Sequence, residues 1–261
     1  RVLKFLSTPW VHWPDTMCTW LERDRVLFTC DLFGSHMASS ELFARDEPRV
    51  LNAAKRYFAE IMMPCGKAVP KAVDKVAPLQ PDIIAPSHGP VFDRPQLILD
   101  AYRRWTVAPP ENLVVLPHVS MHGSTRLLVD RMTEALGARG VRVERFDLLT
   151  LDPGLLATAL MDAATLVLGT PAMLHSLHPH AGNAARLINT LRPKLKYVAA
   201  VGSYGWNGKL FDELATFFPD LKVESLGTVT CKGLPRPSDI EAVDRLADLI
   251  TERHRSLDSA V

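Results

Sequence analysis

The segment NLVVLPHVSMHGSTRLLVDRM, residues 112–132, decides the fold of the second half of the chain. Its first part, Leu113–Leu116, is a run of branched apolar residues that is typical of a buried strand. Its last part opens the stretch Ser124–Leu136, whose apolar residues recur at helical spacing. A polar loop with a glycine separates the two parts. A strand, a loop and a helix in this order predict one repeat of a parallel α/β sheet.

The same alternation continues to the end of the chain. The further expected strands are Val141–Phe146, Ala164–Leu168, Tyr197–Val201 and a last strand near Leu221–Leu226. The further expected helices are Pro153–Ala163, Ala181–Leu191, Lys209–Phe218 and Ser238–His254. Five strands that alternate with helices predict an α/β fold with a doubly wound, five-stranded parallel sheet.

The first region, residues 1–108, is mixed instead of alternating, and the pair Pro109-Pro110 is expected to link it to residues 109–261. A hairpin is expected from two strands around a charged turn, and a third short strand from the run before Ser87. The expected strands are Met17–Leu21, Val26–Thr29 and Pro81–Pro86, and the expected helices are Pro48–Met62 and a weaker one at Lys67–Val76.

Composition excludes several classes of protein. The 261 residues carry 30 Lys and Arg against 29 Asp and Glu, so no basic surface for nucleic acid is expected. No apolar run approaches the roughly 20 residues of a membrane span, and the opening residues do not resemble a secretory signal. The four cysteines form no metal-binding or disulfide pattern, which favours a reducing cytoplasm. The chain begins with Arg1, so we expect it to be processed or part of something longer.

Three segments follow the ends of expected strands and are therefore expected at one edge of the sheet, where doubly wound folds bind ligands. They are Ser120-Met121-His122-Gly123-Ser124-Thr125, Gly169-Thr170-Pro171-Ala172 and Gly202-Ser203-Tyr204-Gly205-Trp206. The first suits a phosphate, because it offers hydroxyls, a glycine and the free N–H groups of a helix start. Alone it is equally compatible with a helix cap that binds nothing.

The other two segments favour a flat ring as the rest of the ligand. Small residues let main-chain groups approach closely, and Tyr204 and Trp206 provide faces for stacking. An isolated aromatic pair is more often a cap on the core, but three segments in register favour a flat phosphorylated cofactor.

These three segments resemble the flavin mononucleotide (FMN) loops of a flavodoxin-like domain. Three further segments resemble the later metal-ligand segments of flavodiiron proteins, also called A-type flavoproteins, which join a metallo-β-lactamase-like di-iron domain to a flavodoxin-like domain in this order. They are His12-Trp13-Pro14-Asp15-Thr16-Met17, Cys30-Asp31-Leu32-Phe33-Gly34 and Pro86-Ser87-His88-Gly89-Pro90. The resemblance covers essentially the whole chain.

The resemblance implies FMN and two iron ions as cofactors. It makes His12 a ligand of one iron, His88 a ligand of the other and Asp31 the carboxylate that bridges both, so that these three are the catalytic residues. Imidazole and carboxylate ligands suit iron. Without the resemblance, each would be taken for an ordinary structural residue. For His36 and Asp15 the family pattern implies supporting or structural roles.

The sequence departs from the family pattern in three places. The family carries a His-x-Glu-x-Asp-His segment upstream of the His12 segment, and it is absent here. We therefore expect residues 1–108 to be the carboxyl-terminal half of a metallo-β-lactamase-like αββα sandwich whose amino-terminal half is missing. The run His175-Ser176-Leu177-His178-Pro179-His180 is expected in an exposed loop, where a histidine could tune the flavin or three could bind a metal. Ala172 replaces a hydroxyl residue of many relatives.

The leading hypothesis is an oxidoreductase that passes electrons from a redox partner through FMN to a di-iron centre, reducing dioxygen to water or nitric oxide to nitrous oxide. The resemblance implies a rubredoxin-like or flavin-reductase donor and a head-to-tail homodimer. The alternative is a flavodoxin-like electron carrier without a working metal site. A zinc hydrolase is disfavoured because the early histidines are absent, and a serine hydrolase because no G-x-S-x-G element occurs.

Overall fold

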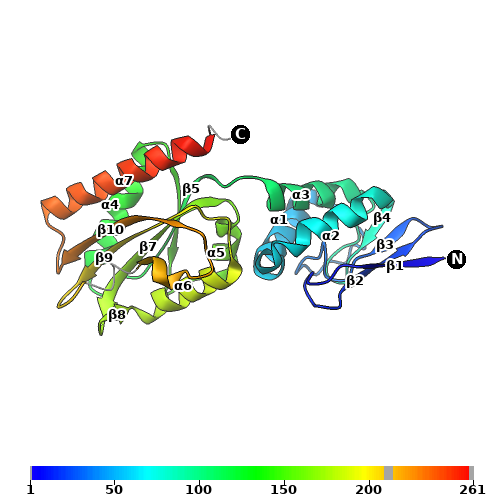
Figure 1. Ribbon diagram of the computed structural model, residues 1–261, viewed down its shortest axis with the longest axis horizontal. Helices are drawn as coiled ribbons and strands as arrows, with labels where there is room; N and C mark the ends of the chain where they lie inside the picture. The colour runs from blue at the N-terminus through cyan, green and yellow to red at the C-terminus, as the bar shows by residue number, and fades with distance from the viewer. Residues whose placement is uncertain (1, 209–213, 259–261) are drawn as a thin grey trace. The chain divides into compact units, whose positions relative to one another are not determined.

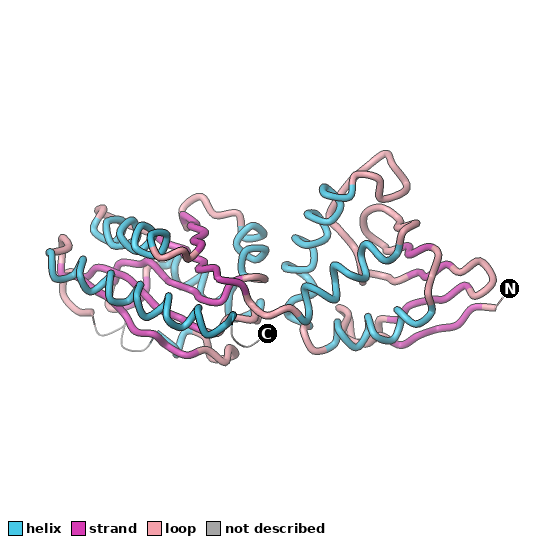
Figure 2. The backbone as a smooth tube through the Cα atoms, turned by 90° about the horizontal axis from the view of Figure 1, so that it is seen from above, coloured by secondary structure: helices cyan, strands magenta, loops and turns pink. Residues whose placement is uncertain are grey.

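A computed structural model describes residues 2–208 and 214–258 of the chain. The chain divides into two compact units, Arg1–Ala108 and Pro109–Val261. Within each unit, helices flank the strands (Figures 1 and 2).

Unit 1 is built on a four-stranded sheet in the order β1-β2-β3-β4. The strands are β1 (Leu3–Ser7), β2 (Met17–Leu21), β3 (Val26–Phe28) and β4 (Ile83–Ala85). β1 and β2 and then β2 and β3 pair antiparallel, and β3 and β4 pair parallel. The carboxyl ends of β1, β3 and β4 therefore meet at one edge of this sheet.

The two faces of the unit 1 sheet differ in burial. One face carries Cys18, Trp20, Leu27 and Ile84, which are at most 4% exposed. On the other face the register aligns Phe5, Thr19 and Phe28 in one row across the strands, and Phe5 and Phe28 are 65% and 47% exposed. The uncovered face is therefore apolar.

Helices cover the buried face of this sheet. They are α1 (Glu47–Tyr57), which continues as a π-helical turn (Phe58–Met62), then α2 (Ala68–Val76) and α3 (Pro95–Val107). Phe58, Tyr102 and Trp105 pack ring against ring between the helices, with centroids 5.2–5.5 Å apart. The sequence did not predict β1 or α3. Pro95 is the first residue of α3, a position where proline is common although it disfavours the interior of a helix.

Unit 2 contains a parallel sheet in the order β6-β5-β7-β9-β10, with a short strand β8 paired to the end of β7. The strands are β5 (Glu111–His118), β6 (Arg142–Asp147), β7 (Ala163–Met173), β8 (Ser176–Leu177), β9 (Tyr197–Tyr204) and β10 (Glu224–Lys232). Numbered along the chain, the five parallel strands lie in the order 2-1-3-4-5 of flavodoxin-like sheets. The predicted α/β fold with a doubly wound parallel sheet is confirmed.

Helices lie on both faces of this sheet (Figure 1). They are α4 (Ser124–Ala138), α5 (Pro153–Leu160), α6 (Pro179–Leu191) and α7 (Pro237–Asp258). Val114 and Leu116 of β5 join α4 and α7 in one core cluster, while Val115 between them is fully buried on the opposite face. Burial on both faces explains why the central strands β5, β7 and β9 contain long apolar runs without alternation.

Four predicted elements of unit 2 differ from the structure. β7 and β9 extend beyond the predicted ends, so residues 169–172 and 202–204 belong to strands, where loops were expected. The last strand begins at Glu224 instead of near Leu221. The expected helix 209–218 lies partly outside the described residues, and its described part, residues 214–217, forms a short 3-10 turn.

Among the described residues, no helix is long and apolar enough to span a membrane.

Candidate functional site

A cavity of about 500 Å³ opens at the carboxyl edge of the unit 2 sheet. Its size falls within the range of small-molecule and cofactor sites. Its lining comprises Met121, His122, Ser124, Pro171, Ala172, Met173, Leu174, Ser203, Tyr204, Gly205, Trp206, Gly233 and Leu234. The structure thus brings all three predicted segments together in one place.

The segment between β5 and α4 presents a helix start to this cavity. The Ser120 hydroxyl accepts hydrogen bonds from the backbone N–H groups of Gly123 and Arg126, at 3.1 and 3.3 Å. Gly123 precedes α4 with φ of +89°, a left-handed conformation that favours glycine. Ser120 thus fixes the loop through its bond to Gly123 and caps the N–H of the third helical residue, Arg126. The N–H groups of Ser124 and Thr125 remain available to an anion.

Two hydroxyl groups of the predicted ligand-binding segments, those of Thr125 and Thr170, form hydrogen bonds within the protein. Thr125 Oγ1 lies 2.9 Å from Ser203 Oγ, and this bond ties the start of α4 to the end of β9. Thr170 is fully buried and donates its hydroxyl hydrogen to the carbonyl of Pro171 at 3.0 Å. Of these three residues, Ser203 alone lines the cavity.

Gly169 contributes by its small size at the back of the site. A Cβ atom at this position would lie 2.7 Å from both His118 Cβ and Val129 Cγ2. Such an approach is far inside normal contact, so only glycine lets α4 and β5 come this close to β7. Gly169 is therefore placed to set the position of the helix start that faces the cavity.

The cavity has a mostly apolar wall that the sequence revealed only in part. Tyr204 and Trp206 lie in it as predicted, and Trp206 is 87% exposed. The last residue of β7 adds Met173, the turn after β7 adds Leu174, and the segment after β10 adds Gly233 and Leu234. Gly233 and Leu234 went unnoticed because the end of β10 was predicted too early, and Met173 because β7 was predicted to end at Leu168. Flat apolar side chains of this kind suit a planar ring.

His175, His178 and His180, the three histidines of the run 175–180, do not line the cavity. His178 is the N-cap of α6 and accepts a hydrogen bond from the His180 backbone N–H at 3.3 Å. The rings of His178 and His180 stack with centroids 5.5 Å apart. Desolvation lowers the pKa of His178, and the charge of His180 adds to this effect. His178 and His180 thus belong to a helix start, where the sequence had suggested a loop.

A second cluster lies at the sheet edge of unit 1 where β1, β3 and β4 end. His12 Nε2 is 3.3 Å from Asp31 Oδ2, and His88 Nε2 is 3.1 Å from Asp31 Oδ1. One carboxylate thus holds two imidazoles, one on each oxygen. The structure brings together all three residues that the sequence suggested as metal ligands.

The loops that carry these residues hold one another in place. The Ser87 backbone N–H donates to the Cys30 carbonyl at 2.8 Å, and the Ser35 N–H donates to the His88 carbonyl at 3.1 Å. A side chain at Gly89 would collide with Ser35 Oγ, at 2.1 Å from the added Cβ. The cluster is therefore supported by backbone contacts on both sides of Asp31.

Each half of the cluster is short of metal ligands. Donor atoms that share a metal at 2.0–2.2 Å lie about 3 Å apart, as the His–Asp pairs do. However, each Asp31 oxygen has one imidazole beside it, whereas catalytic metal positions usually have three protein ligands. Among the described residues, no group of three or more His, Cys, Asp or Glu is arranged to hold a metal ion. The described residues thus place one imidazole nitrogen beside each Asp31 oxygen.

The rings of His36 and Tyr57 lie near His88, with centroids 6.3 and 6.0 Å from its ring. His36 Nδ1 is 3.5 Å from Glu60 Oε2, and the His36 ring meets Tyr57 edge to face at 4.7 Å. Burial and the nearby Asp31 charge raise the pKa of Tyr57, so this phenol stays protonated. Asp15 is exposed.

Known proteins are similar to this chain over both units. A family model described as "ODP family beta lactamase" matches residues 1–89. The chain is 36% identical over 238 residues to the Type A flavoprotein fprA of Rhodobacter capsulatus, covering 85% of this chain and 53% of that protein. It is 30% identical over 260 residues to a nitric oxide reductase of Moorella thermoacetica, covering 97% of this chain and 65% of that protein.

The fold of the chain is also similar to that of a solved structure. Rubredoxin oxygen:oxidoreductase from the anaerobe Desulfovibrio gigas superposes with a TM-score of 0.94 and 26% identity, covering 98% of this chain and 66% of that one. The chain spans between about half and two thirds of the length of these relatives.

Fold and sites together define a protein in which a β-lactamase-like unit precedes a flavodoxin-like unit. In sequence the chain is similar to an A-type flavoprotein, and in fold it is similar to flavodiiron proteins.

Proposed function

We propose that the cavity of unit 2 binds FMN. The observation that carries this proposal is the convergence of a free helix start, small residues and two aromatic side chains at the carboxyl edge of a 2-1-3-4-5 sheet. The N–H groups at Ser124 and Thr125 would hold the phosphate, and Tyr204 and Trp206 would flank the ring. When bound, the flavin takes electrons from a donor and gives them up again.

We further propose that unit 1 is the carboxyl-terminal half of a metallo-β-lactamase-like sandwich. Its uncovered sheet face exposes Leu3, Phe5, Met17 and Phe28, each about half exposed or more. A second apolar sheet, belonging to the missing amino-terminal half, would cover this face, since burying one such side chain is worth roughly 1.5–3 kcal/mol. The same half would bring the remaining ligands to the two metal positions. The span of the chain relative to its relatives supports this proposal.

The assembled protein would be an FMN-dependent di-iron oxidoreductase. His12 and His88 would each hold one iron and Asp31 would bridge both, as the three side chains already lie. Electrons would come from a rubredoxin-like or flavin-reductase donor in the cytoplasm, and a head-to-tail homodimer would place the flavin of one chain beside the irons of the other. The substrate would be dioxygen or nitric oxide. The names of relatives support both, since one is a nitric oxide reductase and another an oxygen oxidoreductase.

The substitution Asp31→Ala tests this function in the chain co-produced with the upstream metal-binding segment of a flavodiiron relative. Consumption of dioxygen and of nitric oxide is followed with electrodes, and flavin content by visible absorbance. Loss of turnover with unchanged flavin is expected, because Asp31 is the carboxylate that serves both metal positions. The exposed Asp74→Ala, in helix α2 of the same unit, serves as control and should keep turnover. Full turnover in Asp31→Ala would contradict the bridging role.

A second function is favoured by the half-filled metal positions. With two donors at each position, the chain alone would bind flavin and act as an electron carrier without metal chemistry. Flavin that is reduced and reoxidised by partner proteins, in a preparation free of iron, would support this second function.

A further inference from the structure

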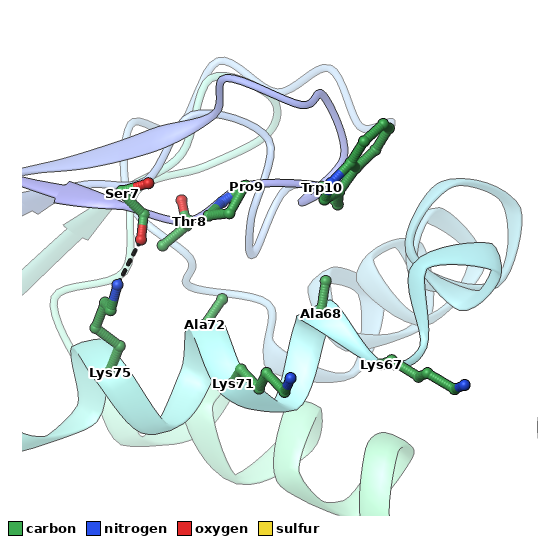
Figure 3. A pocket seen from close by; sticks show the side chains of 9 residues that line it. All are labelled: Ser7, Thr8, Pro9, Trp10, Lys67, Ala68, Lys71, Ala72 and Lys75. Atoms are coloured by element: carbon green, nitrogen blue, oxygen red, sulfur yellow. Dashed lines mark hydrogen bonds between the residues drawn. The ribbon is translucent and has the colours of Figure 1, made fainter.

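Unit 1 contains a cavity of about 510 Å³ between α2 and the segment that follows β1. Figure 3 shows that the ammonium groups of Lys67 and Lys71 point away from this segment. The Lys75 ammonium is already bonded, because it donates to the Ser7 carbonyl at 2.7 Å. Among the described residues of the lining, no lysine thus directs a free charge at a ligand.

The cavity of unit 2 differs, because one of its walls is held from behind by a buried thiol. Cys231 lies near the end of β10 and is 1% exposed. Its thiol donates a hydrogen bond to the Gly233 carbonyl, with Sγ 3.3 Å from the oxygen. Gly233 lines the cavity, whereas Cys231 lies behind the lining. A buried side chain is therefore bonded directly to the cavity wall.

A second hydrogen bond fixes Gly233 from its other side. Its N–H donates to the Tyr204 carbonyl at 2.9 Å, and Tyr204 is itself part of the cavity wall. Gly233 has φ of +71°, a conformation that favours glycine. The next residue, Leu234, lines the cavity with a side chain that is 69% exposed. The Cys231 thiol and the Tyr204 carbonyl together hold the turn that places Leu234.

The surroundings of Cys231 suit this role. It belongs to the core cluster of unit 2, where a thiol packs as a small apolar group and can still donate a weak hydrogen bond. Burial raises the pKa of the thiol to about 11, and the charge of Asp239 adds to this effect. The thiol therefore keeps its proton at neutral pH and remains a donor.

Cys231 also has a counterpart on the neighbouring strand. In the register of β9 and β10 it lies opposite Ser203, whose Oγ is 2.9 Å from Thr125 Oγ1 at the start of α4. The Ser203 bond fixes the phosphate side of the cavity, and the Cys231 bond fixes the side of the aromatic wall. Two adjacent strands thus each hold one side of the cavity through a side-chain hydrogen bond.

We propose that Cys231 is a positioning residue of this cavity, whose thiol holds the turn at Gly233 so that Leu234 and Tyr204 meet the flavin ring. The proposal rests on the proposed FMN site and adds to it a residue that does not touch the ligand. Loss of the thiol should affect the ring and spare the phosphate, because the phosphate side is held by a different segment.

Titration of the full chain with FMN and with riboflavin, which lacks the phosphate, tests the proposal. Visible circular dichroism of the bound flavin reports on the surroundings of the ring. Cys231→Ala should weaken both ligands by the same factor, about threefold or more, and should change the dichroism. Cys231→Ser keeps a donor and should restore most of the affinity and of the spectrum. Ser120→Ala, in the phosphate loop, should weaken FMN more than riboflavin.

A matched control separates positioning from a general loss of stability. Val229→Ala removes a buried side chain of the same core cluster, two residues before Cys231 on β10 and outside the cavity lining. It should lower Tm but leave flavin affinity and dichroism unchanged.

Two results would overturn the role of Cys231 while leaving the FMN site intact. One is unchanged flavin affinity and dichroism in Cys231→Ala, and the other is an equal effect of Cys231→Ala and Val229→Ala on the flavin. A wild-type chain that binds no FMN would give a different result, since it would reject the proposed cofactor site and, with it, the role of Cys231.

Discussion

Replacing Gly169 by alanine tests how closely helix α4 must approach the sheet of unit 2. The new Cβ would lie 2.7 Å from His118 Cβ and from Val129 Cγ2, both of which are buried. Neither atom can rotate away, because one is the first side-chain atom of a strand residue and the other sits in the core cluster. Overpacking of this kind costs about 1–3 kcal/mol.

The loss can be measured by thermal unfolding of the chain, followed by circular dichroism or calorimetry. For a unit of this size each kcal/mol lowers Tm by about 2–4 °C, so about 2 kcal/mol lowers the Tm of unit 2 by about 4–8 °C. FMN affinity should fall as well, since the displaced helix carries the N–H groups of the proposed phosphate site.

A matched substitution on the same helix shows whether the effect is local. A Cβ at Gly137 would meet nothing within 4 Å, so Gly137→Ala in α4 should raise stability, by up to about 1 kcal/mol. A Gly169→Ala protein as stable as the wild type would refute the reasoning that glycine is required for this helix–strand approach.

Three further predictions concern the same two units. The substitution Thr125→Val should lower the stability of unit 2 by about 1–3 kcal/mol and weaken FMN binding, because it leaves the Ser203 hydroxyl without its hydrogen-bond partner. Chemical denaturation measures the stability and flavin titration measures the affinity; unchanged values of both would contradict the role of this hydrogen bond in joining α4 to β9. Burial, with a smaller contribution from the charge of Arg145, lowers the pKa of His118 below its usual 6.5. The unfolded chain therefore takes up the proton first as the pH falls, and the stability of the folded chain decreases below about pH 6.5. A His118→Gln protein should lose less stability between pH 7 and pH 5 than the wild type, and identical stability profiles of the two proteins would argue against this account. In unit 1, Phe28→Ser should reduce binding of a hydrophobic dye without lowering Tm, whereas Leu27→Ser on the buried face should unfold the unit; equal effects of the two would show that the faces were assigned wrongly.

The fold of unit 2 could be predicted from sequence because its strands and helices are local patterns. Each buried strand is a short apolar run, and the helices between them are amphipathic, so the order of elements follows from the chain itself. The ends of β7 and β9 could not be predicted, since strand pairing continues through Gly169 and Gly202 only because neighbouring strands supply hydrogen-bond partners. Such pairing is a property of the assembled sheet.

In the two sites, too, local sequence patterns predicted some residues, whereas contacts between residues far apart in the sequence could not be predicted from such patterns. Hydroxyl-rich and aromatic segments predicted the place of the unit 2 cavity, and the structure adds Met173, Leu174, Gly233 and Leu234 to its lining. The second pair follows a strand whose end the sequence placed too early. In unit 1 the meeting of His12, Asp31 and His88 came from family resemblance, because residues so far apart in sequence give no local sign of a shared site.

The flavin and iron content of the chain, after incubation with FMN and ferrous iron and removal of loosely bound material, tests the central claim most directly. The account predicts about one FMN per chain and no firmly held pair of irons. Among the described residues each Asp31 oxygen lies beside one imidazole, which is fewer donors than a metal ion usually has. A chain that takes up no flavin would contradict the assignment of the unit 2 cavity. Two firmly bound irons per flavin would contradict the claim that the metal ligands are incomplete.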